Sequence, residues 1–517
     1  MGKLRNLVRY VIFTHRYLGI LICLLCVSWF ASGIVMMYAG GMPRVSAQQR
    51  LEALPALDLA NVKLTPAEAV QQAGMGARAP TLTSVLQRPA YSFQGRGDGA
   101  TTVFADTGEV LKPIDIEQAR KVASRFTGQH VERVQYVRTL EQADQWTMMR
   151  GREVGLFKFE VDDGKGTELY VSPASAEVAQ LTTRNTRLLA WIGVVPHWIY
   201  FTALKTNQPV WYKVVVWTST LACVVAVLGL ILGYTQFRKT TPFNLKSSIP
   251  YRGWLRWHYI TGTVFGVFVL TWAFSGMLSM EPFDWTNARG LSIQRDVFSG
   301  GSPQLQSFNA LNNDSLAALV PGRTIKEIEF TRIQDENYYS IKSTANTPAE
   351  DAKAERLHQP YVVDRAQPDA ILVNASTLQP RSEGFSVESL LKRLQAAVPD
   401  TPIVDTQLLT EYDSYYYSRG RQQPLPILRV KFGDPMQTWV YVDPQRSAML
   451  TQVHRYSRIE RWLYNGLHSL DFKFWYSKRP LWDIGMIILL LGGLATSVMG
   501  VYLGIKRLRR DLARVLP

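Results

Sequence analysis

The sequence predicts an α-helical membrane protein with four transmembrane helices and two α+β extracytoplasmic domains, built as a tandem repeat with pseudo-two-fold symmetry. Three observations predict this fold class: four long uncharged apolar runs, basic residues gathered at the ends of those runs, and residues that recur at two fixed spacings. The composition agrees, because 47% of the 517 residues are hydrophobic and only 19% are charged. Such a chain is more apolar than a water-facing one usually is.

Four apolar runs predict the transmembrane helices. They cover residues 17–38, 214–234, 259–280 and 484–505 and contain no charged side chain. A helix of about 20 residues crosses about 30 Å of hydrocarbon, so each run is long enough. Buried helices of a soluble protein are the alternative, and four separate uncharged runs argue against it. The first run also resembles a cleavable secretory signal, but it has an internal copy near residue 258, which a signal would not have.

Basic residues at the membrane edges set the expected topology. They lie at both termini and in the middle linker, with Asp511 as the one acid among them: Lys3, Arg5, Arg9, Arg238, Lys239, Lys246, Arg252, Arg256, Lys506, Arg507, Arg509, Arg510 and Arg514. Because basic flanks stay cytoplasmic, both termini and the linker are expected on the cytoplasmic side of the membrane, with the two long segments on its outer side. These segments carry nearly balanced charge, so the net charge of +15 does not indicate nucleic-acid binding.

The expected segments follow from the runs and their flanks. In chain order they are a cytoplasmic N-terminus (1–14), a transmembrane helix (15–38), a periplasmic α+β domain (39–182), an interfacial helix (183–210), a transmembrane helix (211–236), a cytoplasmic linker (237–257), a transmembrane helix (258–280), a second periplasmic domain (281–453), a second interfacial helix (454–481), a transmembrane helix (482–505) and a cytoplasmic tail (506–517). Amphipathic patterns predict helices at 117–126 and 387–398, and alternating patterns predict strands at 169–171 and 439–442.

Residues of the first half of the chain recur in the second half at two offsets. At an offset of 243, the pattern H-x3-G-x9-W-x2-S-G runs from His15 to Gly33 and again from His258 to Gly276. At an offset of 271, ten positions recur: Tyr170/Tyr441, Pro173/Pro444, Arg184/Arg455, Arg187/Arg458, Trp191/Trp462, His197/His468, Pro209/Pro480, Trp211/Trp482, Gly229/Gly500 and Gly233/Gly504. Recurring polar residues are the first candidates for a site, because a repeat shows which positions both copies share.

Four of the seven histidines occupy repeated positions and are the candidate cofactor ligands. His15 and His258 begin their helices near the cytoplasmic face, whereas His197 and His468 precede the outer ends of the second and fourth helices. Two imidazoles suit the two faces of a planar haem iron. Because no C-x-x-C-H motif is present, non-covalent haem b is expected, one or two molecules with bis-histidine ligation. The three unpaired histidines are expected on the surface: His130, His358 and His454.

Other interpretations of these residues stay open. A neutral histidine near hydrocarbon can hydrogen-bond a carbonyl without binding a metal. A zinc or copper pathway would need carboxylates or thiolates beside the imidazoles, and the apolar runs hold almost none. Cys23 and Cys26 form a C-x-x-C within one helix and are interpreted as packing residues. Since Cys23, Cys26 and Cys223 all lie in apolar runs, no disulfide is expected in the outer domains.

Glycines and arginines flank the paired histidines. Gly19 and Gly262 follow His15 and His258 by one turn, and the G-x-x-x-G pairs are Gly229/Gly233 and Gly500/Gly504. These glycines leave room either for a macrocycle or for a neighbouring helix. Four arginines precede the outer histidines and are candidates for pairing with haem propionates: Arg184, Arg187, Arg455 and Arg458. An interfacial helix anchored by Arg and Trp is the equal alternative for these four.

The sequence also resembles a known family. The segments E-L-Y-V-S-P at 168–173 and W-V-Y-V-D-P at 439–444 resemble the ends of PepSY modules, and each leads into a stretch with Trp and His. Together with the repeated His, Trp and Gly positions, nearly the whole chain resembles the PepSY-associated transmembrane proteins, a group that includes iron-regulated, PiuB/FoxB-like inner-membrane siderophore reductases. The resemblance implies two PepSY-like periplasmic domains, haem binding, and reduction of a ferric chelate at the periplasmic face.

The functional hypothesis is a haem b electron-transfer protein, an oxidoreductase of iron uptake that reduces a ferric siderophore or similar small acceptor. Its partners are expected to be the lipid bilayer and a donor that is a quinol or a cytoplasmic reductase. No catalytic residue is assigned, because the outer segments contain no nucleophile, paired-metal or phosphate-loop motif. The alternative is a haem-free membrane protein whose outer domains bind a peptide, protease or siderophore in a regulatory or transport role.

Overall fold

The computed structural model describes residues 2–74, 79–93, 101–150, 155–242, 244–282, 290–309, 311, 316, 318–345, 370–418 and 423–515. The chain divides into two compact units. Residues 1–42, 188–288 and 456–517 form the first, which we call the membrane unit. Residues 43–187 and 289–455 form the second, which we call the sheet unit. The chain therefore leaves the membrane unit and returns to it twice.

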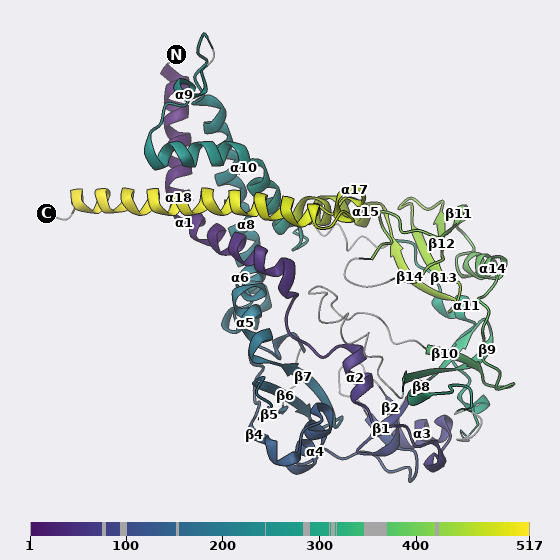
Figure 1. The fold of residues 1–517 in the computed structure, drawn as a ribbon. Helices are drawn as coiled ribbons and strands as arrows, with labels where there is room; N and C mark the ends of the chain where they lie inside the picture. The colour runs from purple at the N-terminus through teal and green to yellow at the C-terminus, as the bar shows by residue number, and fades with distance from the viewer. Residues whose placement is uncertain are drawn as a thin grey trace. The chain divides into compact units, whose positions relative to one another are not determined.

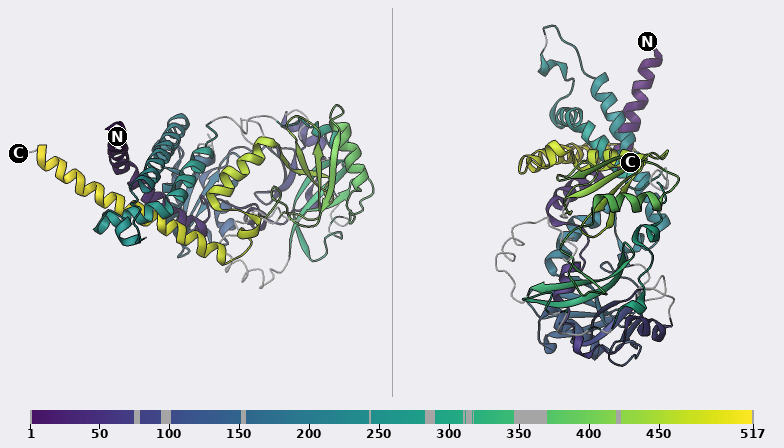
Figure 2. Two further views of the ribbon diagram at one scale, coloured as in Figure 1. Left: turned by 90° about the horizontal axis from the view of Figure 1, so that it is seen from above. Right: turned by 90° about the vertical axis from the view of Figure 1, so that its right-hand side faces the viewer.

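Four long helices make up most of the membrane unit (Figures 1 and 2). They are α1 (Gly2–Ala39), α8 (Gln208–Thr235), α10 (Gly253–Leu278) and α18 (Leu481–Val515). All four are long and apolar enough to cross a membrane, as the sequence predicts. Capping residues help to fix where α8 begins, because Asn207 accepts a hydrogen bond from the Val210 amide and Pro209 lies in the first turn.

The four helices pack around an apolar core. Helix α1 contacts α8 and α18, and α10 contacts the same two helices. The buried residues between them are Ile22, Cys26, Phe30, Met37, Ala222, Trp272, Ala273, Trp482, Met486 and Leu490. Large apolar side chains such as Leu21, Trp217 and Val264 point outward and are exposed. Such a surface is expected of helices that lipid surrounds.

Short helices occupy the stretches where one interfacial helix each was expected. The first stretch contains α5 (Arg184–Ile192), α6 (Val194–Trp198) and α7 (Thr202–Lys205), and the second contains α15 (Arg455–Arg461), the π-helical turn η5 (Trp462–Gly466), α16 (Leu467–Ser469) and α17 (Lys473–Tyr476). The breaks have a local cause. Ile199 and Leu470, at matching positions of the repeat, have φ of 54° and 47°. A left-handed residue ends a helix and turns the chain.

The described residues of the sheet unit form three sheets, and one of them joins the two outer segments (Figure 1). Its order is β10-β9-β8-β1-β2-β3. The strands are β1 (Thr81–Val85), β2 (Arg88–Phe93), β3 (Thr101–Phe104), β8 (Arg323–Ile333), β9 (Glu336–Ala345) and β10 (Ala370–Asn374). Strand β1 pairs antiparallel with β8, with Leu82 opposite Ile328. The outer segments, which the sequence predicted to form two α+β domains, therefore share a sheet. This pairing gives hydrogen-bond partners to the N–H and C=O groups of strand edges that each segment would otherwise expose.

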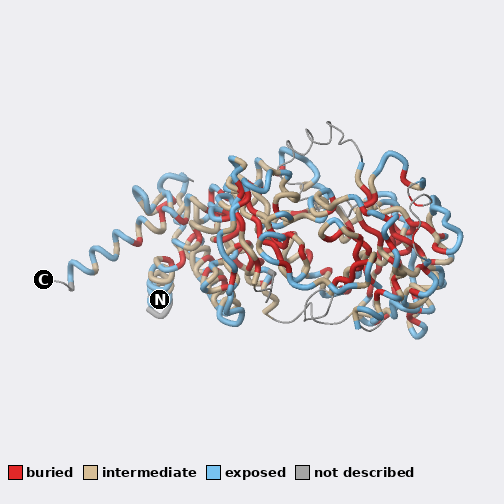
Figure 3. The backbone as a smooth tube through the Cα atoms, turned by 90° about the horizontal axis from the view of Figure 1, so that it is seen from below, coloured by how far each residue is buried: buried red, intermediate tan, exposed pale blue. Residues whose placement is uncertain are grey.

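Each outer segment adds a four-stranded sheet of its own. The first has the order β4-β5-β6-β7 and the second β11-β12-β13-β14. The strands are β4 (Val134–Thr139), β5 (Phe157–Val161), β6 (Thr167–Ser172), β7 (Glu177–Thr182), β11 (Ile403–Leu409), β12 (Ile427–Phe432), β13 (Trp439–Asp443) and β14 (Ala448–Val453). Helix α4 (Ile116–Thr127) packs on the first sheet and α14 (Val387–Ala397) shares a buried core with the second. Both helices, with β6 and β13, match the predicted patterns. Figure 3 shows the buried residues in red.

The remaining described elements are short. They are α2 (Ala47–Ala53), α3 (Pro66–Ala73), α9 (Leu245–Ser248), α11 (Arg295–Ser299) and the 3₁₀ turns η1 (Leu59–Asn61), η2 (Val131–Arg133), η3 (Met148–Arg150) and η4 (Leu305–Ser307).

Candidate functional site

The four repeated histidines form two pairs in the membrane unit. His15 on α1 faces His258 on α10, with ring centroids 6.5 Å apart and an interplanar angle of 40°. His197 on α6 faces His468 on α16, with centroids 6.0 Å apart and an angle of 76°. These are the two pairs that the repeat offsets single out. The His15–His258 pair lies in the parts of α1 and α10 nearest the basic flanks. The His197–His468 pair lies on short helices that follow the two sheet-unit segments in the chain.

Backbone carbonyls fix the tautomer of the first pair. His15 Nδ1 lies 3.0 Å from the Val225 carbonyl oxygen, and His258 Nδ1 lies 3.0 Å from the Thr496 carbonyl oxygen. A carbonyl oxygen accepts hydrogen bonds and cannot donate, so each Nδ1 must carry the proton. Nε2 then keeps its lone pair on both rings. Val225 and Thr496 are related by the offset of 271 residues, so the same orienting contact recurs.

Serine hydroxyls contact the rings of the second pair. Ser32 Oγ donates to the Ser28 carbonyl at 2.6 Å and lies 3.1 Å from His197 Nδ1. Ser275 Oγ donates to a carbonyl of its own helix and lies 3.0 Å from His468 Nδ1. A hydroxyl whose proton points to a carbonyl accepts a hydrogen bond from a protonated Nδ1. This arrangement matches the one at the first pair.

The repeated glycines separate into two groups. A methyl carbon added to Gly229 would lie 2.9 Å from His15 Cε1. One added to Gly500 would lie 2.6 Å from Cys23 Sγ on α1 and 3.5 Å from His258 Cε1. The nearest atoms to such a carbon are Thr263 Oγ1 for Gly233 and Ile20 Cγ1 for Gly504. Gly229 thus makes room for a histidine ring. The other three glycines make room for a neighbouring helix, and Gly500 also contacts the His258 ring.

The candidate arginines are divided between the two units. Arg184, Arg187 and Arg455 belong to the sheet unit, whereas Arg458 and the four histidines belong to the membrane unit. Arg187 donates to Thr182 Oγ1 at 2.9 Å and pairs with Glu168 at 3.4 Å. Its guanidinium is therefore already bound to an acid of its own unit, which favours a structural role for this residue.

A buried ion pair close to His468 escaped the sequence comparison. Arg461 and Asp471 are 9% and 1% exposed. Arg461 Nη2 donates to the Asp471 carbonyl at 2.9 Å and lies 3.5 Å from its carboxylate. Their counterparts in the first half are Ala190 and Tyr200, so a search for identical repeated residues misses them. The signal that would have found them is a charged residue in one copy whose counterpart in the other copy is uncharged.

The unpaired histidines lie outside this site. His130 is exposed, as expected. The prediction that His454 is a surface residue is wrong, because it is 8% exposed and packs beside Gly290. His358 lies outside the described residues. Within the described part of the chain, no group of three or more His, Cys, Asp and Glu side chains is placed to hold a metal ion.

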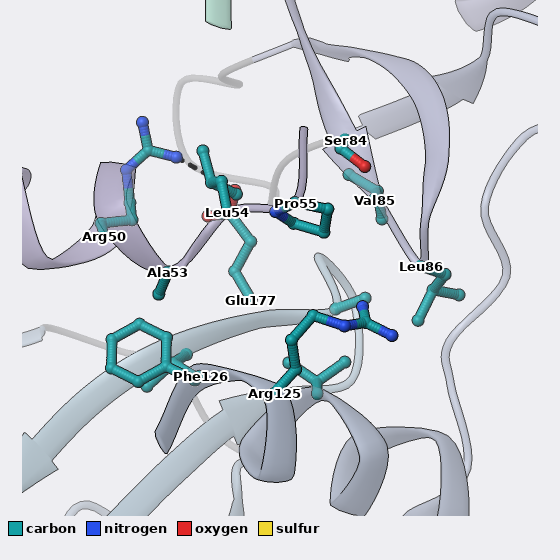
Figure 4. Close-up of a pocket in the computed structure, with 13 residues that line it drawn as sticks. Arg50, Ala53, Leu54, Pro55, Ser84, Val85, Leu86, Arg125, Phe126 and Glu177 are labelled. Atoms are coloured by element: carbon teal, nitrogen blue, oxygen red, sulfur yellow. Dashed lines mark ion pairs between the residues drawn. The ribbon is translucent and has the colours of Figure 1, made fainter. Parts of the chain in front are cut away.

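A small pocket in the sheet unit is too small for a chelate. Its volume is about 50 Å³, and Arg50, Arg125, Phe126 and Glu177 are among the residues that line it (Figure 4). Arg50 forms an ion pair with Glu177 at 3.5 Å and another with Glu327. Ligand pockets are typically several hundred Å³, so this pocket has room for only a few water molecules.

Comparison with known proteins agrees with the fold. The family model described as the PepSY-associated TM region matches residues 13–359, which is more than half of the chain and includes His15, His197 and His258. No curated protein matches the chain. With its four membrane-crossing helices and its β-rich sheet unit, the chain is a multi-pass membrane protein that belongs to the family of PepSY-associated transmembrane proteins.

Proposed function

We propose that the membrane unit binds haem b at each histidine pair and carries electrons from one side of the bilayer to the other. One observation carries the proposal: the two pairs have similar separations, and each Nδ1 has a hydrogen-bond partner from the chain. A lone neutral histidine that serves only packing has no need of a second imidazole at ligand spacing. Here the arrangement occurs twice, at the two ends of the same helix bundle.

The spacing of the rings fits two axial ligands. Two iron–nitrogen bonds of about 2 Å each, and about 1 Å from each ligating nitrogen to its ring centre, put two axial imidazoles about 6 Å apart. The observed separations are 6.5 Å and 6.0 Å. A hydrogen bond at Nδ1 that orients the ring is also the usual second contact of a metal-binding histidine.

Residues of the chain orient the ligands and exclude water. Haem iron, when bound, accepts and releases single electrons as it changes between Fe³⁺ and Fe²⁺. The carbonyls of Val225 and Thr496 and the hydroxyls of Ser32 and Ser275 hold the rings, and the apolar core between α1, α8, α10 and α18 keeps the space between the pairs dry. Four apolar helices without an ion pathway suit electron transfer better than ion transport.

We further propose a ferric siderophore, or a similar ferric chelate, as the acceptor, with a quinol or a cytoplasmic reductase as the donor. The basic flanks support an inner-membrane orientation with both termini cytoplasmic, so that the acceptor is reached on the periplasmic side. Ferrous iron binds hard oxygen chelators less tightly than ferric iron does, so one-electron reduction releases the metal.

Absorbance of the purified protein tests the proposal. We expect a Soret band and a pyridine haemochrome spectrum of haem b, with two haems per chain. His258→Ala should remove one haem and leave the other, and His468→Ala should do the same at the other pair. His130→Ala, an exposed histidine, is the control and should change nothing. Protein without a Soret band, or loss of all haem from one of the single changes, would contradict the proposal.

A further inference from the structure

We propose that Phe30 and Trp272 relay the electron between the two histidine pairs, along a single route from His258 to His468. The inference rests on the proposed function. With haem bound at both pairs, the iron that His15 and His258 would hold would give up one electron and be oxidised, and the iron that His197 and His468 would hold would accept it and be reduced. No bond forms or breaks and no proton moves. The donor behind the first pair is a quinol or a cytoplasmic reductase, and the acceptor beyond the second is a ferric chelate.

Hydrogen bonds connect His258 to helix α18. His258 Nδ1 donates to the Thr496 carbonyl at 3.0 Å. Thr496 Oγ1 in turn donates to the Gly492 carbonyl at 2.9 Å, one turn closer to the other pair. The next residue, Gly493, has no side chain to separate its backbone from α1. This part of the route therefore runs through covalent and hydrogen bonds alone.

Two aromatic side chains continue the route from Gly493 to His468. A methyl carbon added to Gly493 would lie 2.7 Å from the Phe30 ring, so the ring lies directly on the glycine backbone. The Phe30 and Trp272 rings meet edge to face, with centroids 5.7 Å apart. Trp272 Nε1 then donates to the His468 carbonyl at 2.8 Å. Phe30 and Trp272 are 6% and 8% exposed, respectively.

The matching route in the other half of the repeat is incomplete. The counterparts of Thr496 and Gly493 are Val225 and Ala222, which offer neither the hydroxyl nor the bare backbone. The counterpart of Phe30 is Ala273, so the linking ring is missing. Trp29, the counterpart of Trp272, is only half-buried, and among the described residues its indole nitrogen has no hydrogen-bond partner.

These departures from the repeat all favour the route through Phe30 and Trp272 over the matching route in the other half of the repeat. Electronic coupling falls off more slowly through bonds and close-packed atoms than across gaps. Three residue differences between the copies, at Thr496, Gly493 and Phe30, coincide on one chain of contacts. The hydrogen bond from Trp272 to the His468 carbonyl completes that chain. Ordinary helix packing would not require these three positions to differ together, because the two halves of the bundle pack helices of the same type.

Electron transfer across vesicles that contain the full-length holoprotein tests the relay. Dithionite is enclosed in the vesicles, ferricyanide is added outside, and the rate of haem reoxidation is followed. We expect Trp272→Phe and Phe30→Leu each to slow transfer about tenfold, and the control Trp29→Phe to change it by less than about twofold. Haem stoichiometry and both midpoint potentials should stay as in the unaltered protein, which a general structural defect would not allow.

A second measurement needs no haem. In the apoprotein, ultraviolet resonance Raman spectra should lose one strongly hydrogen-bonded indole signal in Trp272→Phe and none in Trp29→Phe. If the unaltered protein holds no haem, the proposed function fails and the relay with it. If haem is present but Trp272→Phe and Phe30→Leu transfer electrons at the normal rate, or Trp29→Phe slows transfer equally, only the relay is overturned. If Trp272→Phe loses haem, the transfer rate of Phe30→Leu alone decides whether the relay holds.

Discussion

At each of the four paired histidines, a hydrogen bond at Nδ1 orients the ring. Two of the partners are backbone carbonyls, which can only accept, and two are serine hydroxyls that also contact carbonyls of their own helix. The serines were visible in the sequence as part of the repeated H-x3-G-x9-W-x2-S-G pattern. Their role was not, because the serine of one copy contacts a histidine that belongs to a different repeated set.

Removing a serine hydroxyl should loosen the second pair. Ser32→Ala and Ser275→Ala leave His197 or His468 without the oxygen that orients the ring, and loss of such a contact typically costs about tenfold or more in affinity. We expect faster haem transfer to apomyoglobin from the His197–His468 pair, with no change at the other pair. Thr218→Ala is the matched control, since Thr218 bonds only carbonyls of its own helix. Equal loss from Thr218→Ala would refute this role of the serines.

At the scale of elements, close approach between helices decides where the rings lie. Gly229 on α8 and Gly500 on α18 stand behind the two rings of the first pair. Helical periodicity predicts that these glycines face neighbouring helices, and the G-x-x-x-G spacing is typical of helix packing. It does not say which glycine meets a histidine and which meets an apolar side chain, because that depends on the rotation of each helix.

Gly229→Ala should displace His15. The added methyl would lie 2.9 Å from His15 Cε1, too close for the ring to keep its position, so we expect loss of the haem at the His15–His258 pair. Gly19→Ala is the control, because its methyl would meet nothing nearer than Val225 at 4.0 Å. Both changes gain about 1 kcal/mol of helix propensity, so a difference between them reports the ring contact. Haem stoichiometry measures it, and an unchanged Gly229→Ala protein would exclude this steric role.

At the scale of the whole molecule, the sheet unit joins residues that lie far apart in the chain. Its largest apolar core takes Leu82, Tyr91 and Phe93 from the first outer segment and Ile328 and Phe330 from the second, among others. Two copies of a repeat can fold as separate domains or share a core. Here β1 pairs with β8, and the two segments lie in one compact unit with a shared core.

Ile328→Ala should therefore weaken both outer segments. Ile328 is fully buried on β8 opposite Leu82, and the cavity should lower the free energy of unfolding by about 2–5 kcal/mol. We expect faster hydrogen exchange at amides of β1 and β2 as well as β8 and β9. Val404→Ala, at a position that is 62% exposed on β11, serves as the control. Faster exchange confined to the second segment would show that the segments fold independently.

The sequence by itself determined the four membrane helices, the two repeat offsets and the grouping of four histidines into two pairs. These features depend on local apolarity and on spacing along the chain, which a sequence records directly. The bounds of the expected segments and the proposed topology stay predictions. Only the tertiary structure decided which glycines lie behind the rings, which groups contact each Nδ1, and that the outer segments share a sheet. Each of these depends on contacts between residues far apart in the chain, so their cause is packing in three dimensions and not local pattern.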